Sequence, residues 1–187
     1  ALALAREVGA ANLQTEPGGP LATGQAWEDA ARLFYDEFMP CVEVAERLEV
    51  GLLIEPEPGL MIEHFEQYLR FVERIQSPYV GLNFDLGHAY CVGEDPQFWV
   101  EQMAPHTRHY HLEDIAATRV HQHLIPGHGA IDFRATLAAI ARTGYQGWIT
   151  VELYPYLEDP DAAAREAFQY VTGVLQELGI SYPRRDG

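Results

Sequence analysis

The 187-residue chain contains no lysine, so arginine supplies every basic side chain apart from histidine. Without lysine the protein cannot form the Schiff base of a lysine-dependent aldolase, and it cannot use the lysine of a phosphate-binding P-loop. Any electrophilic catalysis by this chain therefore needs a metal ion, an arginine or a histidine.

The chain has few basic side chains relative to acidic ones. Twelve arginines stand against 28 acidic residues, which gives a formal net charge of −16 at pH 7. Proteins that bind nucleic acid usually offer a basic face that neutralises phosphates. The composition therefore predicts that nucleic acid is not a partner.

Cysteines and long apolar runs are also few. Cys41 and Cys91 have neither the spacing of a metal site nor that of a disulfide framework. No apolar run approaches the roughly 20 residues that cross a bilayer, and the opening sequence ALALAREVGAANL carries charged residues unlike a secretory signal. These features predict a cytoplasmic protein that does not enter a membrane.

What the chain does contain is a repeated unit, a short apolar strand followed by a helix, with the roughly 30-residue period of a βαβ unit. The expected strands are residues 11–15, 51–54, 79–84, 109–112 and 147–153. The expected helices are residues 2–8, 27–48, 61–75, a short helix opening at 95–96, 133–143 and 162–178. Such alternation predicts an α/β fold with a parallel sheet and right-handed crossovers, in a single domain over residues 1–187.

Metal-binding residue types stand at or just past the ends of four of these strands: Glu55, Asp85, His111 and Glu152. In a parallel barrel the strand ends open on one face, so these side chains should converge. Three carboxylates and one imidazole suit one divalent ion such as Mn²⁺, Mg²⁺, Co²⁺ or Zn²⁺. A single strand-end acid is more often a helix cap, but four such residues at successive strands favour a metal site.

The number of strands is smaller than a closed barrel requires. A closed (β/α) barrel has eight strands and usually about 250 residues, whereas this sequence offers five. We therefore expect an incomplete TIM barrel, about strands four to eight of eight, without its first three βα units.

The series LLIEP, FDLGH, HYHLED, PGHGAIDF and ITVELY resembles the xylose isomerase-like TIM-barrel superfamily. Its members include sugar-phosphate isomerases, ketose 3-epimerases, inosose-processing enzymes and endonuclease IV. The resemblance implies that Glu55, Asp85, His111 and Glu152 are the metal ligands after strands five to eight. In the ketose 3-epimerases two glutamates, corresponding to Glu55 and Glu152, exchange a proton beside a metal-polarised carbonyl. The resemblance thus implies an isomerase or epimerase of a small keto-sugar, polyol or hydroxy-acid.

Further polar residues are candidates for binding this carbohydrate-like substrate. His88 and Arg119 resemble residues that contact substrate oxygens in sugar-processing relatives. His121 and His123 form an HxH pair whose side chains share a face if the segment is extended, and we expect them to bond substrate hydroxyls or a carboxylate. The plainer interpretations are a histidine bonded to nearby backbone and a solvated loop arginine.

Alternatives to this function remain open from the sequence. In endonuclease IV the counterparts of His88, His121 and His123 hold an additional zinc, so a second metal at these histidines is one alternative. A multi-zinc phosphodiesterase is disfavoured by the charge, by Glu16, which stands where endonuclease IV carries a histidine, and by His121, which stands where it carries an aspartate. A non-catalytic barrel that only binds metal or ligand is disfavoured by the intact ligand set. Glu57 and Glu63 are predicted to lie on the surface, and homo-oligomerisation stays open.

Overall fold

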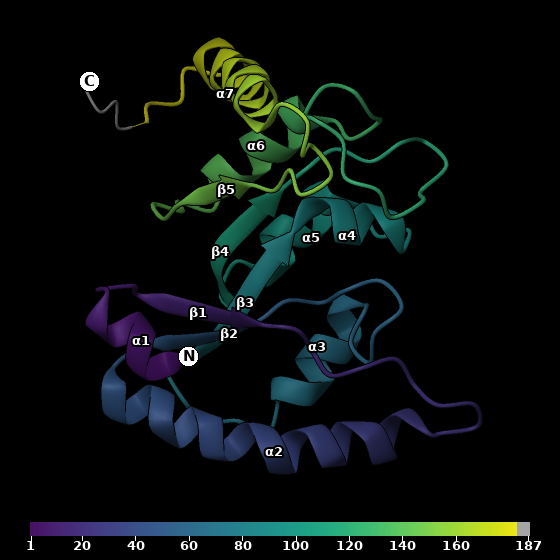
Figure 1. Ribbon diagram of the computed structural model, residues 1–187, viewed down its shortest axis with the longest axis vertical. Helices are drawn as coiled ribbons and strands as arrows, with labels where there is room; N and C mark the ends of the chain where they lie inside the picture. Colours follow the sequence, from purple (N-terminus) through teal and green to yellow (C-terminus); the bar gives the residue numbers. More distant parts are fainter. Residues whose placement is uncertain (183–187) are drawn as a thin grey trace.

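The computed structural model describes residues 1–182, which contain one five-stranded parallel sheet. The strands are β1 (Asn12–Thr15), β2 (Gly51–Ile54), β3 (Val80–Asp85), β4 (Thr107–Leu112) and β5 (Ile149–Val151). They lie side by side in chain order, and each pairs in parallel with the next. In Figure 1 the sheet turns steadily from β1 to β5, with the helices on its outer side. The predicted incomplete TIM barrel is confirmed.

Helices connect the strands and follow the predicted order. They are α1 (Leu2–Glu7), α2 (Trp27–Leu48), α3 (Phe65–Val72), α4 (Leu86–Cys91), α5 (Pro96–Met103), α6 (Phe133–Arg142) and α7 (Pro160–Glu177). Asp95 caps α5 by accepting a hydrogen bond from the Gln97 N–H, with Pro96 in the first turn. Asp132 likewise accepts from the Ala135 N–H at the start of α6. These starts follow from local capping chemistry that the sequence displays.

Helix α3 is shorter than the predicted helix over residues 61–75. Tertiary hydrogen bonds hold the preceding segment out of the helix, because the Trp27 indole N–H donates to the Met61 carbonyl at 2.8 Å and the Glu57 N–H donates to the Ile62 carbonyl at 2.9 Å. The Gln67 side chain then accepts from the His64 N–H and starts the helix at Phe65. This non-helical turn before α3 leaves Glu57 near the end of β2.

Helix α4 begins directly at the end of β3 and was not among the helices expected from the sequence. The Asp85 carboxylate accepts a hydrogen bond from the His88 N–H at 2.7 Å and so caps the helix. Six residues are too few for a hydrophobic period to be visible in the sequence. The helix fixes His88 above the end of β3.

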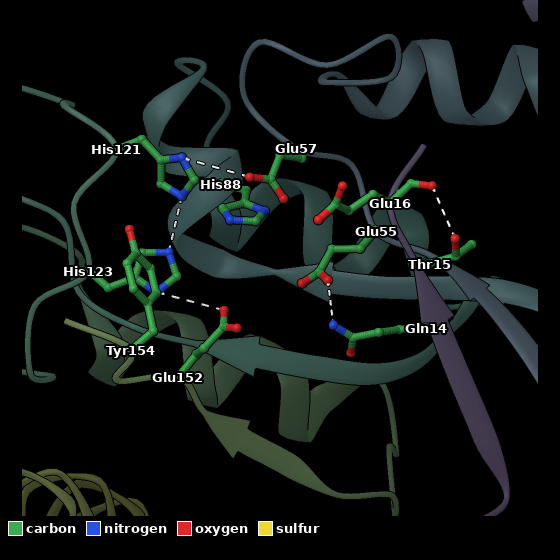
Figure 2. Close-up of a pocket in the computed structure, with 10 residues that line it drawn as sticks. All are labelled: Gln14, Thr15, Glu16, Glu55, Glu57, His88, His121, His123, Glu152 and Tyr154. Atoms are coloured by element: carbon green, nitrogen blue, oxygen red, sulfur yellow. Dashed lines mark hydrogen bonds and ion pairs between the residues drawn. The ribbon is translucent and has the colours of Figure 1, made fainter. Parts of the chain in front are cut away.

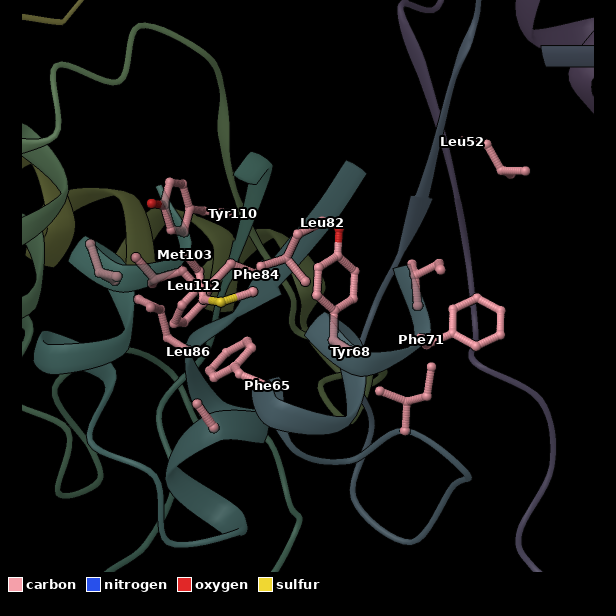
Figure 3. Packing of buried hydrophobic residues seen from close by; sticks show 14 of the residues in the cluster. Leu52, Phe65, Tyr68, Phe71, Leu82, Phe84, Leu86, Met103, Tyr110 and Leu112 are labelled. Atoms are coloured by element: carbon pink, nitrogen blue, oxygen red, sulfur yellow. The ribbon is translucent and has the colours of Figure 1, made fainter. Parts of the chain in front are cut away.

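A hydrophobic core between the sheet and its covering helices holds the strands in register. Phe84 of β3 is fully buried, and its ring centroid lies 4.5 Å from that of Phe65 and 5.5 Å from that of Tyr110. Figure 3 shows these rings packed together with Met103 and Leu112. Burying one such side chain contributes about 1.5–3 kcal/mol. This packed core therefore fixes the positions of the strand ends.

The sheet has two edges within residues 1–182, because β1 and β5 each pair with one neighbour. Trp148, which precedes β5, is 68% exposed. Exposed parallel edges are surfaces that proteins normally cover. Within the same range, no helix combines the length and the apolarity that a membrane span requires.

Candidate metal and substrate site

The four predicted ligands stand at neighbouring strand ends. Asp85 pairs with His111 in the register of β3 and β4, and His111 pairs with Thr150 of β5. Glu55 and Glu152 directly follow β2 and β5 and continue their ladders, since the Glu55 N–H donates to the Thr15 carbonyl and the Glu152 N–H donates to the Leu112 carbonyl. Parallel pairing therefore carries all four side chains to one edge of the sheet.

The three carboxylates converge on the His111 imidazole. Its Nδ1 atom lies 2.9 Å from Glu55 Oε1, 3.8 Å from Glu152 Oε2 and 4.0 Å from Asp85 Oδ2. Glu55, Asp85 and His111 are buried, whereas the Glu152 side chain is 37% exposed. One wall of the cluster is thus open to a substrate.

Unpartnered atoms make this cluster suitable for a divalent cation. Within residues 1–182, Glu55 Oε1, Asp85 Oδ2 and His111 Nδ1 are buried without a hydrogen-bond partner. The 2.9 Å contact of Glu55 with His111 lacks hydrogen-bond geometry. Buried polar groups without partners are costly, and a divalent ion would satisfy all three atoms. The donor set fits one metal ion, and the ligand role of these residues stays a prediction.

Glu55 is oriented by a chain of side-chain amides. Its other oxygen, Oε2, accepts a hydrogen bond from Gln14 Nε2 at 2.9 Å, and Gln14 Oε1 accepts from Asn83 Nδ2 at 3.2 Å. These bonds turn Oε1 toward His111. Partners behind a ligand commonly fix its orientation in metal sites.

The charges of the cluster attract a cation. Burial alone would lower the pKa of His111, but the neighbouring carboxylates, Glu55 first, raise that pKa above its ordinary value. Burial raises the pKa of Glu152, with Asp85 and Glu55 adding to the rise. A proton on His111 thus stands among the same three carboxylates that would surround a metal ion.

A cavity of about 500 Å³ opens beside this cluster (Figure 2). Its walls combine residues from the ends of β1, β2 and β5 with the loops over them: Gln14, Thr15, Glu16, Glu55, Glu57, His88, His121, His123, Glu152 and Tyr154. Among residues 1–182, no arginine lines it, and the charged types that do are glutamate and histidine. Such a lining suits hydroxyl groups better than phosphate.

Three of the predicted substrate-binding residues meet in this cavity. His88 Nδ1 lies 3.0 Å from the Pro56 carbonyl, which can only accept, so Nδ1 carries a proton and Nε2 is left for another partner. The Nε2 atoms of His121 and His123 lie 3.0 Å apart, so one donates to the other. Burial lowers the pKa of His123 to about 4. Neutral imidazoles of this kind bind hydroxyl groups or a metal, and a second metal at these histidines stays a prediction.

Arg119 lies apart from the cavity. Its guanidinium stacks over the Tyr90 ring, 4.4 Å from the centroid, and donates to the Tyr90 carbonyl at 2.6 Å. Its predicted contact with substrate therefore has no support in this geometry. Glu57, in contrast, was expected on the surface but lines the cavity, with Oε1 4.0 Å from His121 Nδ1, and burial raises its pKa.

The sequence analysis did not single out Glu113, the most enclosed acid of the site. Its side chain is fully buried, and both carboxyl oxygens lack a hydrogen-bond donor among the described residues. Burial, followed by the charge of Asp85, raises its pKa well above the ordinary value. Alternation along a strand could have identified it, because Glu113 lies two residues beyond His111 and so on the same face.

Comparisons with known proteins agree with this fold. Residues 1–173 match the family model described as xylose isomerase-like TIM barrel. The chain is 29% identical over 163 residues to the rhizopine catabolism protein MocC of Rhizobium meliloti, covering 77% of this chain and 47% of that protein. It is 24% identical over 170 residues to an inosose dehydratase of Bacillus thuringiensis (strain Al Hakam), covering 81% and 56%. The chain thus spans about half the length of these curated relatives.

Solved structures share the same arrangement of strands and helices. A D-tagatose 3-epimerase-like protein superposes with a TM-score of 0.86 at 23% identity, over 95% of this chain and 67% of that one. The IOLI protein, with a bound zinc atom, gives 0.76 at 22% identity over 95% and 66%. The 3-keto-D-glucoside 4-epimerase YcjR from E. coli gives 0.78 at 20% identity over 92% and 67%. At these identities the likeness concerns the fold.

Proposed function

The chain belongs to the xylose isomerase-like TIM-barrel family, and on this premise we propose that it serves a metal-dependent enzyme that moves a proton beside the carbonyl of a small keto-sugar, polyol derivative or hydroxy-acid. The observation that carries the proposal is the convergence of three carboxylates on His111 Nδ1, with buried oxygens that have no other partner in the described chain. Relatives of the chain include inosose dehydratases and sugar epimerases.

One divalent ion would be held by Glu55, Asp85, His111 and Glu152, and it would supply Lewis acidity that polarises a substrate carbonyl and makes the neighbouring C–H acidic. Two of its ligands can also move that proton. Glu55 follows β2 and Glu152 follows β5, with two strands between them, so their carboxylates reach the cavity from different sides. In an epimerisation one glutamate takes the proton and the other returns a proton on the opposite face.

Histidine and amide side chains of the cavity would orient the substrate. His88 offers Nε2, because its Nδ1 is engaged with the Pro56 carbonyl. The His121–His123 pair and Gln14 add further donors and acceptors in the same cavity. Hydroxyl groups of a small polyol match such partners, and correct placement of the reacting carbon contributes much of the rate of enzymes.

Elimination of water is the second candidate, because several curated relatives are inosose dehydratases. A dehydratase begins with the same proton removal, after which the hydroxyl on the next carbon departs with a proton as water. Epimerisation and dehydration therefore share Glu55 and Glu152, and they differ in the product. Mass spectrometry separates an isomer from a product that has lost water.

The experiment measures deuterium uptake from heavy water into keto-sugars and inososes by the full-length, metal-loaded protein. Glu55→Gln and Glu152→Gln should each reduce exchange by about 10²–10⁴-fold, the usual contribution of general acid–base catalysis. Glu158→Gln, which changes an exposed loop acid after β5, should leave the exchange unchanged.

Full exchange by both metal-replete glutamine variants would reject the acid–base roles of Glu55 and Glu152. Incision of abasic DNA without exchange into any sugar would transfer the assignment to a phosphodiesterase. Metal binding without either reaction would support a non-catalytic barrel instead.

A further inference from the structure

The loop of residues 115–131, between β4 and α6, carries His121 and His123 into the cavity. A single side chain closes this loop at its base. Asp114 is 1% exposed and accepts four backbone N–H groups, those of Ile115, Gly127, Gly129 and Ile131. The loop therefore begins and ends on one carboxylate.

The two oxygens of Asp114 divide these donors evenly. Oδ1 accepts from Ile115 at 2.9 Å and from Ile131 at 3.1 Å. Oδ2 accepts from Gly127 at 2.9 Å and from Gly129 at 2.7 Å. Hydrogen bonds to a charged acceptor are stronger than neutral ones, so this carboxylate holds the first and the last residues of the loop together.

The glycines of the PGHG turn are matched to this carboxylate. Gly127 has a φ of +96°, a backbone conformation that L side chains rarely adopt. A Cβ atom at Gly129 would overlap the Asp114 carboxylate and the Ile115 carbonyl. The turn can therefore approach Asp114 closely enough to donate its N–H groups only with glycine at these positions.

Asp114 also holds the chain next to His123 through its backbone. Its N–H donates to the Leu124 carbonyl at 2.9 Å, and its carbonyl accepts from the Leu124 N–H at 2.8 Å. His123 directly precedes Leu124 and is 2% exposed. The main chain of Asp114 thus fixes the residue beside His123, while its side chain fixes both ends of the loop.

We propose that Asp114 is the positioning residue that sets His121 and His123 at the substrate. The inference rests on the proposed function for the identity of the substrate class, but the placement of the two imidazoles can be tested without catalysis. Asp114 is not among the residues that line the cavity, and its side-chain hydrogen bonds go to residues 115–131, so its effect should reach the site through the loop.

Asp114→Asn tests the proposal in the full-length protein. Asparagine keeps one acceptor oxygen, but its amide N–H₂ then faces two backbone donors, so about half of the hydrogen bonds are lost. We expect kcat/KM for the exchange reaction to fall about tenfold or more. The fall should come mainly from a higher KM, because the loosened loop would hold His121 and His123 less firmly at the substrate. The affinity for the divalent ion should stay within about twofold of that of the wild type, because the ligands lie outside the loop.

Two further variants separate positioning from general stability. Gly129→Ala would push the turn away from the Asp114 carboxylate, because its Cβ would overlap that carboxylate. It should therefore reproduce the effect of Asp114→Asn. Asp132→Asn is the matched control, because Asp132 lies beside the same loop but its side chain accepts from the Ala135 N–H at the start of α6, not from the loop. It should leave kcat/KM and KM unchanged.

Imidazole NMR signals and hydrogen exchange give readouts that need no substrate. In Asp114→Asn the resonances of His121 and His123 should shift, those of His111 should not, and amide exchange should accelerate in residues 115–131 alone. Unchanged His121 and His123 signals with unchanged loop exchange would refute the positioning role. A uniform rise of exchange with a matching loss of metal affinity would also refute it, since that is a general loss of stability. Absence of turnover by the wild type would reject the proposed function, while these signals still decide the role of Asp114.

Discussion

Replacing Glu113 by glutamine should make the metal-free protein more stable than the wild type, by an amount that grows as the pH rises. Glutamine has the shape of glutamate but no charge, and Glu113 is a fully buried acid with no donor to either oxygen among the described residues. Burial and the nearby Asp85 raise its pKa well above the ordinary value of 4.5. The folded wild type therefore keeps a proton that the unfolded chain releases.

The sign of the pH effect follows from this difference. Below about pH 4.5 both states hold the proton, and the acid contributes its full stability. Between the ordinary pKa and the raised folded pKa the folded state binds more protons than the unfolded state, so the free energy of unfolding decreases as the pH rises. One proton accounts for at most about 1.4 kcal/mol per pH unit.

The wild type should therefore lose up to about 2.7 kcal/mol between pH 5 and pH 7 through this one group, and Glu113→Gln should not. The measurement is the free energy of unfolding from urea titrations of both proteins at several pH values in the presence of a chelator. His88 and His111 also titrate with raised pKa values, but they occur in both proteins, so the difference between the curves reports the Glu113 proton together with its interaction with Asp85.

Glu158→Gln provides the matched control, because it removes an acid from an exposed loop. Its stability curve should run parallel to that of the wild type. If the curve of Glu113→Gln also runs parallel to the wild type, Glu113 is ionised in the folded state, and the prediction that Glu113 is a neutral acid there is wrong.

Three further outcomes follow from the site and the core. Adding Zn²⁺ or Mn²⁺ to the chelated protein should raise Tm, since an ion at 100 times its Kd adds about 2.7 kcal/mol; His111→Gln should remove most of this gain, and an unchanged wild-type Tm would contradict the metal site. Gly87→Ala should cost roughly 1–3 kcal/mol in urea titrations, because the added methyl group would overlap the Glu113 carboxylate. The same change in a Glu113→Ala background should cost much less, and an equal cost would disprove the contact. Phe84→Ala should cost roughly 3–5 kcal/mol, and a loss below about 1 kcal/mol would be inconsistent with its full burial.

The sequence predicted the strands and the four converging side chains because both depend on local patterns. Apolar runs with a βα period imply a parallel sheet, and a parallel sheet carries successive strand ends to one edge. Glu55, Asp85, His111 and Glu152 meet for that reason alone. No long-range contact had to be known to place them.

Features that depend on contacts between distant segments were not predictable. Glu57 lines the cavity in a non-helical turn before α3, and the Trp27 indole, 34 residues from Met61 in sequence, hydrogen-bonds to the Met61 carbonyl in that turn. Arg119 lies on Tyr90 instead of in the cavity through a packing contact that no spacing in the sequence reveals. Asp114 reads in the sequence as one more acid after a strand, and only the folded loop brings four N–H groups to it.

The order of the strands also gives the order in which the site is completed during synthesis. Each strand pairs with the strand made just before it, so the sheet can grow by one unit at a time as the chain emerges from the ribosome. Of the proposed ligands, Glu55, Asp85 and His111 are in place once β4 has paired, but the fourth, Glu152, follows β5. A nascent chain arrested before β5 would have three of the four donors and would hold the ion less firmly. Capture of the proposed ion would thus mark the moment at which β5 has joined the sheet, and it would make that step harder to reverse.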